Sequence, residues 1–315
     1  MIKNRLIQNA KKIDKFLINY LNRQERSLLI NPMKYGVISG GKKIRSTVIL
    51  SAGKIFNVDH IADLRFNILN EFVDKFVIVE STVNHQGKPK KLHFDIEKYK
   101  KFKDKINYII VDDTPESIKK PHIGGESLVE QHQRNSIMRG LKKCHENDLI
   151  ILSDVDEIPD LTKLNQFNKK SKYTVFSQKA FAYKLNLLNK SEDNWHGSKM
   201  CLKKNLKSPQ WLRDLKFKKY PFWRIDKPQN LQIIENGGWH FAYLLNSKEI
   251  SKKIKSFAHG EDNKKDNTDI DKIENKMENL LHPTKGFKLK KVEIDETFPK
   301  YILDNISYYD EWIAK

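Results

Sequence analysis

Three carboxylates stand within four residues at Asp154, Asp156 and Glu157, directly after the apolar run 149–152. An unbroken apolar run of this length is typical of a strand buried on both faces. Carboxylates this close repel one another, and a bound divalent cation is an economical source of compensating charge. Carboxylate oxygens suit Mg²⁺ or Mn²⁺, which commonly share their coordination shell with substrate phosphates. The pattern is also short enough to be a solvated acidic turn.

The way the strand ends decides how these acids are arranged. If strand geometry persists to Asp156, the side chains of Asp154 and Asp156 project to the same side. Ligands of open α/β sheets bind beyond the carboxyl ends of strands, so the acids stand where a ligand is expected. Glu157 is a candidate for orienting a ligand, and capping of the following turn is an equal alternative.

Strand and helix patterns alternate around this stretch. The expected strands cover residues 75–82, 106–113, 149–152, 172–178 and 231–244, and the expected helices cover residues 63–72 and 126–143. This alternation predicts an α/β sheet with a mostly parallel core and flanking helices. We expect residues 61–246 to form that core. Residues 247–315, polar and mostly helical in pattern, are expected to complete the same domain.

Two glycines interrupt the last expected strand immediately before Trp239 and His240. Glycine inside a strand pattern marks a bulge or a close approach of the backbone. His240 is therefore a candidate third metal ligand or diphosphate contact, although a lone histidine is as often structural. Trp239 is a candidate for stacking on a sugar or a base, with core packing as the plainer interpretation.

Three arginines are candidates for clamping a diphosphate, because the guanidinium fork matches phosphate oxygens. They are Arg134, Arg213 and Arg224. Each has the alternative of an ordinary surface or salt-bridge residue. Glu80, at the end of an expected strand, is a candidate nucleotide contact, with a turn residue as the alternative.

Composition limits the classes of partner. The chain has 315 residues and a formal net charge of +19, and residues 1–60 hold 12 Lys and Arg against 3 Asp and Glu. Such a chain is expected to meet phosphorylated substrates or an anionic membrane surface. The lysines are scattered and form no recognised nucleic-acid module, so we expect no nucleic-acid partner. Two cysteines, and no apolar run near the ~20 residues of a membrane span, favour a cytoplasmic protein, with peripheral contact at the inner face of the membrane as an option.

The N-terminal segment has a character of its own. Residues 35–56 carry the segment GGKKIR and resemble the N-terminal end of trans-polyprenyl diphosphate synthases. In that family a Gly-Gly-Lys-x-x-Arg segment binds the diphosphate of isopentenyl diphosphate, so Lys42 and Arg45 are the matching residues. The family's two D-D-x-x-D segments do not occur in this sequence. We expect residues 1–60 to form a short helical extension, with isoprenoid diphosphate binding as an alternative function.

A second resemblance covers the chain from about residue 62 to its end. Its segments are LRFNILNEFVDKFVIVEST, GKPKKLHF, QRN, SDVDEIPD, SPQWLR, YPFWR and ENGGWHF, in this order. They are similar to glycosyltransferase family 17, the family of the β-1,4-mannosyl-glycoprotein β-1,4-N-acetylglucosaminyltransferases. The resemblance implies a GT-A-like fold, a nucleotide-sugar donor such as UDP-GlcNAc, Mn²⁺ or Mg²⁺, and inversion at the anomeric carbon.

The activity implied by this resemblance is metal-dependent transfer of a sugar onto a glycan or lipid-linked acceptor. Asp154, Asp156 and His240 are then the expected metal ligands. Inversion needs a base that deprotonates the acceptor hydroxyl. The candidate bases are Asp193, Glu235 and Glu192. The alternative is a non-catalytic fusion, in which the N-terminal segment is joined to a crippled glycosyltransferase domain.

Overall fold

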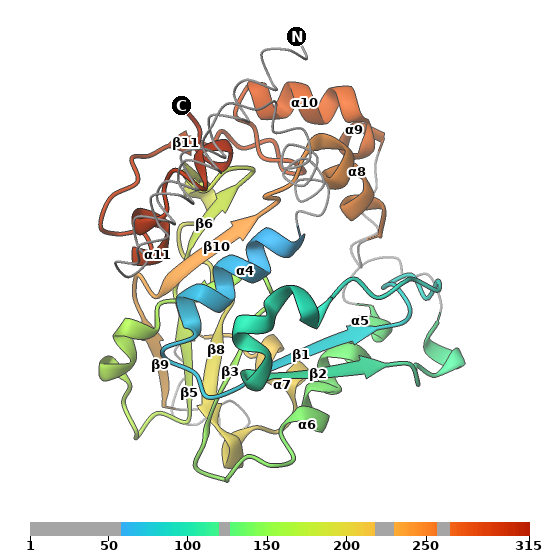
Figure 1. Ribbon diagram of the computed structural model, residues 1–315, viewed down its shortest axis with the longest axis vertical. Helices are drawn as coiled ribbons and strands as arrows, with labels where there is room; N and C mark the ends of the chain where they lie inside the picture. The colour runs from blue at the N-terminus through green and yellow to red at the C-terminus, as the bar shows by residue number, and fades with distance from the viewer. Residues whose placement is uncertain (1–57, 120–126, 218–229, 257–264) are drawn as a thin grey trace, which may run out of the picture. The chain divides into compact units, whose positions relative to one another are not determined.

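The computed structural model describes residues 58–119, 127–217, 230–256 and 265–315 (Figure 1). Contacts along the chain divide it into residues 1–58 and 59–315, and the second unit contains almost all of the described residues. The expected N-terminal helices, together with Lys42 and Arg45, lie outside the described residues. The described unit is a mixed α/β structure with three sheets and flanking helices.

The first sheet pairs β1 (Phe76–Ser81) with β2 (Ile106–Val111) in parallel, from Phe76 opposite Ile106 to Ser81 opposite Val111. Both strands confirm the predictions from their apolar runs. The predicted helix 126–143 is two shorter helices, α5 (Leu128–Asn135) and α6 (Ile137–Gly140). The hydroxyl of Ser136 donates to the His132 carbonyl oxygen at 3.0 Å, and such back-bonding bends helices.

The second sheet contains β3 (Leu149–Leu152), β8 (Lys199–Leu202), β5 (Tyr173–Phe176) and β9 (Leu231–Ile234), in that order. Within the part of the chain that the structure describes, strand β3 lies at the edge of this sheet and pairs with β8 alone, antiparallel. The prediction that β3 is buried on both faces is therefore wrong, since Leu149 is 41% exposed. An apolar run does not by itself distinguish a central strand from an edge strand.

The third sheet has the order β11 (Lys290–Lys291), β7 (Leu187–Leu188), β6 (Lys179–Ala182), β10 (Gly238–Ala242) and β4 (Glu157–Pro159). Among the described residues five of the eight strand pairings are antiparallel. The mostly parallel core that we predicted is therefore wrong. From β3 to β8 each strand is joined to the next by a loop or a short 3₁₀ turn. Parallel strands need a longer crossover connection, usually a helix.

The two glycines near residue 237 move the chain from one sheet to another. Strand β9 ends before them in the second sheet, and β10 begins at Gly238 in the third. Gly238 has φ +137°, and a Cβ there would collide with the Ile158 carbonyl oxygen. The predicted close approach of the backbone is therefore confirmed at this position.

Helix α4 (Val58–Leu69) fixes the first sheet to the rest of the unit (Figure 1). Its Phe66 makes edge-on ring contacts with Phe76 and Tyr99, at centroid distances of 4.9 and 5.0 Å. Phe66 belongs to the main hydrophobic core together with Phe181 of β6 and Phe241 of β10. Because the apolar residues of α4 are packed in the core, the helix cannot rotate, and its polar side chains point in fixed directions.

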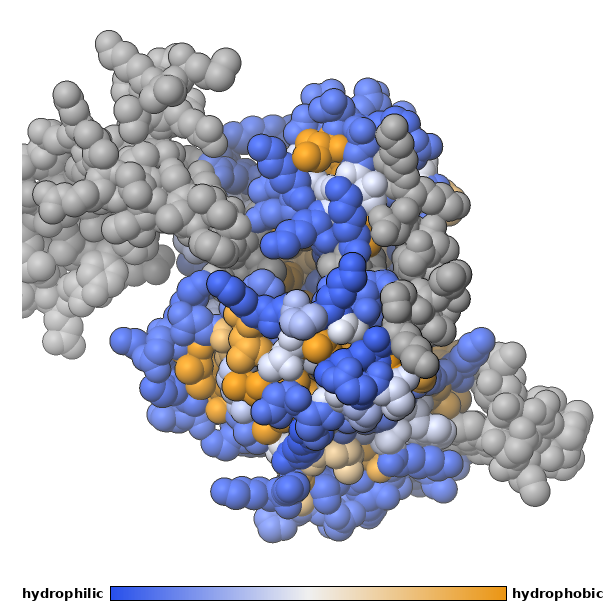
Figure 2. Space-filling view, turned by 90° about the vertical axis from the view of Figure 1, so that its right-hand side faces the viewer, coloured by the Kyte–Doolittle hydropathy of each residue, from blue (hydrophilic) through white to orange (hydrophobic). Residues whose placement is uncertain are grey.

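Five further helices and six 3₁₀ segments belong to the described residues. They are α7 (Pro209–Asp214), α8 (Ser247–Ser256), α9 (Lys265–Thr268), α10 (Ile270–Glu278) and α11 (Lys300–Asp304), with 3₁₀ segments η1 (Ile96–Lys105), η2 (Glu116–Ile118), η3 (Leu161–Gln166), η4 (Lys190–Glu192), η5 (Lys203–Asn205) and η7 (Asp310–Trp312). The described part of residues 247–315 contains helices α8 to α11, and it also contains strand β11 and loops. No helix in the described ranges is long and apolar enough to cross a membrane. Hydrophilic residues predominate on the face drawn in Figure 2.

Candidate active site

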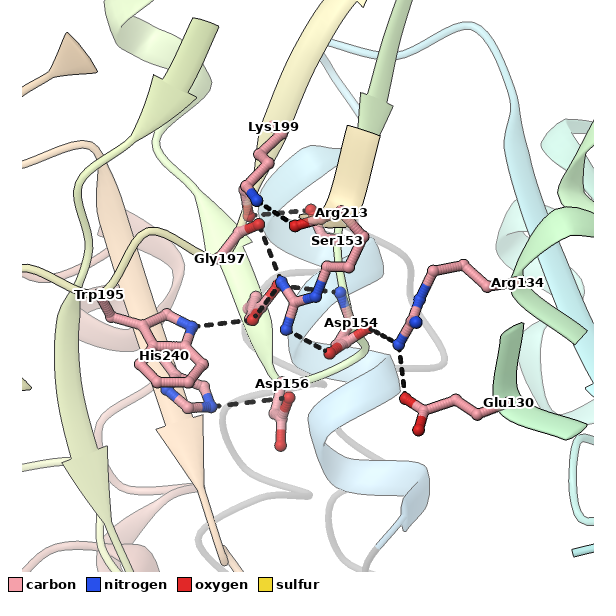
Figure 3. Close-up of polar contacts among 12 residues, drawn as sticks. Glu130, Arg134, Ser153, Asp154, Asp156, Trp195, Gly197, Lys199, Arg213 and His240 are labelled. Carbon is pink, nitrogen blue, oxygen red and sulfur yellow. Dashed lines mark hydrogen bonds and ion pairs between the residues drawn. The ribbon is translucent and has the colours of Figure 1, made fainter. Parts of the chain in front are cut away.

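Asp154 and Asp156 lie on the tight turn that joins β3 to β4, and Glu157 is the first residue of β4. Strand β3 ends at Leu152, and the Glu157 N–H donates to the Asp154 carbonyl oxygen at 3.1 Å. Strand geometry therefore does not persist to Asp156, and the two aspartates have different partners (Figure 3). The interpretation as a solvated acidic turn is wrong for Glu157 and Asp156, whose side chains are 1% and 17% exposed and face cationic side chains. The Asp154 side chain is 43% exposed, although it is paired with Arg213.

Glu157 is the buried centre of the turn. Its carboxylate accepts hydrogen bonds from the Trp195 indole N–H at 2.8 Å and from the Asp154 backbone N–H at 3.0 Å. Gly197 lies directly against it, and a Cβ at that position would collide with the carboxylate. The cap of the next helical turn is Asp160, so the capping role considered for Glu157 is wrong. Glu157 instead fixes the shape of the acid turn.

Arg213, on α7, neutralises this half of the turn. Its guanidinium lies 3.0 Å from the Glu157 carboxylate and 2.8 Å from Asp154 Oδ2, and it also donates to the Gly197 carbonyl oxygen at 3.0 Å. Although burial opposes the shift, Glu157 and Asp154 raise the pKa of Arg213 above its ordinary value. The Lys199 ammonium donates to the Arg213 carbonyl oxygen and so holds the end of α7. Figure 3 shows the guanidinium at the centre of these contacts.

Two further arginines approach the same turn. Arg134, on α5, binds Glu130 at 2.5 Å and Gln210 at 2.6 Å, and its Nη2 lies 3.8 Å from Asp154 Oδ1. Arg65, on α4, donates to the carbonyl oxygens of Asp154 at 3.1 Å and Glu157 at 2.5 Å. Part of the positive charge that we expected from a metal ion is therefore supplied by arginines.

Asp156 has a separate set of partners. Its Oδ1 lies 3.8 Å from His240 Nε2, and its Oδ2 lies 3.4 Å from the Lys253 ammonium. The His240 ring stacks on Trp195 with centroids 4.5 Å apart (Figure 3), and His240 Nδ1 is buried without a hydrogen-bond partner in the described structure. The structure therefore brings Asp156 and His240 together, from the turn after β3 and from β10.

The two aspartates also differ in their acidity. Although part of the Asp154 side chain faces solvent, desolvation by surrounding protein atoms and the charge of Glu157 raise its pKa to about 7, against the opposing charges of Arg213 and Arg134. Burial also acts on Asp156, but Lys253 and His240 outweigh it and lower the pKa of Asp156 below its ordinary value. The pKa of Asp156 therefore lies below that of Asp154.

Asp156 and His240 are placed so that both could bind one cation. A third protein ligand is not in place beside them. In the described ranges no three His, Cys, Asp or Glu side chains are placed to hold one ion together. Asp156 and His240 are too far apart for a hydrogen bond at 3.8 Å. Two ligands at about 2.1 Å from one ion are separated by roughly 3 to 4 Å. Asp154 would join them only after leaving Arg213.

Two of the nucleotide-contact candidates are engaged elsewhere. Glu80, at the end of β1, binds the Lys90 ammonium at 2.5 Å and the Tyr108 hydroxyl at 2.9 Å, and it also accepts two backbone N–H groups of its own loop. Trp239 is buried in the main core, and its indole N–H donates to the Thr297 carbonyl oxygen at 3.0 Å. The contacts of Glu80 are those of a residue that stabilises a turn, and the contacts of Trp239 are those of a core residue.

The remaining candidates are spread over the surface or lie outside the described residues. Asp193, just after η4, and Glu235, just after β9, are both exposed. Glu192 forms an ion pair with Lys285 and accepts from Asn189 at 3.1 Å. Arg224 belongs to a range that the structure does not describe.

Comparison with known proteins decides the family. A sequence model of glycosyltransferase family 17 matches residues 20–279. The chain belongs to glycosyltransferase family 17. No curated protein and no solved structure matches it. The match begins inside the segment 1–60, whose resemblance to polyprenyl diphosphate synthases stays a prediction.

Three residues of this family 17 site escaped the sequence analysis. They are Arg65, Trp195 and Lys253. Arg65 stands between buried apolar residues of an amphipathic helix, and Lys253 stands in a lysine-rich one, so local pattern does not separate them from solvated surface charges. Trp195 alone could have been noticed in the sequence, because it is a large aromatic residue in a polar loop that also contains Gly197.

Proposed function

We propose that this family 17 protein is a metal-dependent inverting glycosyltransferase, which transfers N-acetylglucosamine from UDP-GlcNAc to a glycan or lipid-linked acceptor. The observation that carries the proposal is the approach of Asp156 and His240 to 3.8 Å beside the arginine-braced acid turn. A turn of this kind binds a nucleoside diphosphate when a cation is shared between protein and phosphate.

A GT-A-like arrangement is part of the proposal. Strands β1 and β2 are parallel and contact α5 and α6, and the acid turn follows β3. Helix α5 contacts β1, and its Arg134 lies 3.8 Å from Asp154 in the acid turn. In this arrangement the nucleoside would lie on the β1–β2 side and the diphosphate at the turn.

Asp156 and His240 would hold Mn²⁺ or Mg²⁺, with donor phosphates and water completing the shell. When bound, such an ion neutralises charge on the departing nucleotide. The protein's own part is to hold this half of the turn still. Glu157 fixes the backbone at Asp154, Arg213 holds the Asp154 carboxylate, and Trp195 fixes the plane of the His240 ring.

The arginines divide into two roles in this proposal. Arg213 is a positioning residue, since its guanidinium already contacts Glu157, Asp154 and Gly197. Arg134 and Arg224 remain our candidates for contacting the diphosphate. Glu80 and Trp239 remain candidate donor contacts only through movements that free them from their present partners.

The acceptor hydroxyl needs a base, and Asp193 and Glu235 are our candidates. Both are exposed, so either is accessible to an acceptor. Asp193→Asn and Glu235→Gln distinguish them, because loss of the base is expected to lower kcat by roughly 10²- to 10⁴-fold. If both variants keep wild-type kcat, neither residue is the base.

The cellular setting that we propose is cytoplasmic, with peripheral contact of the basic chain to an anionic membrane. Cosedimentation with vesicles containing an anionic lipid, compared with neutral vesicles, tests this contact. Binding to both kinds of vesicle or to neither would contradict an electrostatic contact.

The proposed activity is tested by titrating the protein with UDP-GlcNAc and a panel of other nucleotide sugars, with Mn²⁺ and with EDTA. We expect UDP-GlcNAc to bind and to be hydrolysed slowly only when Mn²⁺ or Mg²⁺ is present. Donor binding that is unchanged by EDTA would contradict the metal dependence. Absence of binding by every donor would contradict the glycosyltransferase proposal itself.

A further inference from the structure

Helix α8 brings one of its four lysines into the site and leaves the other three, Lys248, Lys252 and Lys255, in solvent. Ile250 and Ile254 are 0% and 1% exposed and fix one face of the helix in the core. Lys253 lies beside that face, and its ammonium is 3.4 Å from Asp156 Oδ2. The position of the Lys253 ammonium is thus set by the packing of α8.

Strand β10 supplies a second support for this lysine. The chain leaves β10 at Tyr243 with φ +54°, a left-handed conformation that costs free energy for a residue other than glycine. The Lys253 ammonium lies 5.1 Å from the centroid of the Tyr243 ring, a distance at which the ring attracts a cation. The same strand carries His240, the other neighbour of Asp156. One strand therefore helps to place both groups that face this carboxylate.

The charges around Asp156 are not compatible with a second cation unless one of them moves. Asp156 carries one negative charge, and the Lys253 ammonium already lies against one of its two oxygens. A divalent cation shared by Asp156 and His240 would repel that ammonium across a few ångströms. The donor diphosphate would arrive at the same place with negative charge. Lys253 is 31% exposed, so its side chain has room to turn toward such a ligand.

We propose that Lys253 is a donor-binding residue that changes partner: its ammonium neutralises Asp156 before the donor arrives and contacts the donor diphosphate once a divalent cation occupies Asp156. This inference rests on the proposed function, because it needs a cation and a nucleoside diphosphate in the site. It differs from that proposal in assigning the diphosphate contact to α8.

The test measures two affinities without turnover. Mn²⁺ binding in the absence of nucleotide is followed by electron paramagnetic resonance, and UDP binding at saturating Mn²⁺ is followed by calorimetry. For Lys253→Met we expect Mn²⁺ alone to bind about threefold or more tightly, since a competing charge is gone, and UDP to bind about tenfold more weakly. Lys253→Arg should recover part of the UDP affinity because it restores the charge. Lys252→Met, which removes an exposed lysine of the same helix, should match the wild type.

Unchanged UDP affinity in Lys253→Met would overturn the inference. So would weaker binding of both Mn²⁺ and UDP together with a lower melting temperature, since that combination indicates a structural role. A wild-type protein that binds neither Mn²⁺ nor UDP contradicts the proposed function before any variant is made. A wild type that binds both, with Lys253→Met identical to it, removes only the role of Lys253.

Discussion

The two aspartates of the acid turn stand two residues apart and have very different surroundings. Asp154 belongs to a tight cluster with Glu157 and Arg213, in which the contacts are 2.8 to 3.1 Å long. Asp156 faces His240 and Lys253 at 3.8 and 3.4 Å. We call the first group the locked half of the site and the second, Asp156 with His240 and Lys253, the open half.

This difference indicates a division of labour within one short motif. Hydrogen bonds join Arg213 to Glu157 and to Asp154 Oδ2, so a ligand at these oxygens would have to displace a well-made ion pair. The longer distances of the open half leave coordination positions for a ligand that is not yet bound. The locked half therefore carries stability, and the open half carries ligand binding.

The largest effect is expected from Asp156→Asn, which removes the charge of the open half and keeps its shape. We expect transfer to fall by roughly 10³-fold, because stabilisation of the departing nucleotide is lost. The melting temperature should stay close to that of the wild type, since no buried charge is left without a partner. Initial rates with UDP-GlcNAc and a thermal melt check both parts. Transfer within a fewfold of wild type would contradict the role of the open half.

Arg213→Ala removes the cation of the locked half, which pairs with Glu157 and Asp154. Glu157, which is 1% exposed, would keep its charge without its arginine, and breaking a buried pair in this way costs about 3–5 kcal/mol of unfolding free energy. Urea unfolding followed by circular dichroism measures the loss. The matched control is Arg139→Ala, which breaks an exposed pair with Asp113 and should cost about 1 kcal/mol or less. Equal losses in the two variants would show that the locked half is not a stability element.

His240→Ala tests whether the open half binds a cation through two residues. We expect the affinity for Mn²⁺ to fall by about tenfold or more, because one of two protein ligands is lost. Trp195, which stacks on the ring, should keep its bond to Glu157, so the melting temperature should change little. Unchanged Mn²⁺ affinity would show that His240 is structural.

A smaller loss of stability than that of Arg213→Ala is expected from Trp195→Phe, which lies between the two halves. The phenyl ring keeps an aromatic face for His240 but loses the indole N–H that binds Glu157 at 2.8 Å. Removing a hydrogen bond to a buried charged group is expected to cost about 1.5–3 kcal/mol of stability. Calorimetric unfolding and Mn²⁺ titration separate the two contributions. A large loss of Mn²⁺ affinity without loss of stability would place Trp195 in the open half alone.

The fold was predictable where strands are continuous and apolar. Strands β1 and β2 follow their apolar runs, and Gly237 and Gly238 mark the place where the chain changes sheets. Strand direction and neighbourhood were not predictable in the same way. The edge position of β3 and the antiparallel pairings depend on which distant strand lies alongside. An apolar run does not indicate which strand that is.

The site was predictable in its acids and much less in its cations. The density of carboxylates after β3 identified the turn, and the glycines of β10 drew attention to His240. Arg65 and Lys253 reach the turn from α4 and α8, 92 and 97 residues away from their partners in the chain. Their neighbours in the sequence resemble those of solvated residues, so only tertiary packing identifies them.

The most direct test of the division between the two halves is the Mn²⁺ affinity of Asp156→Asn compared with that of Asp154→Asn, measured by electron paramagnetic resonance with UDP present. We predict that Asp156→Asn loses measurable Mn²⁺ binding, whereas Asp154→Asn retains most of it and melts at a lower temperature. Equal losses of Mn²⁺ affinity in the two variants, or a greater loss in Asp154→Asn, would contradict the division.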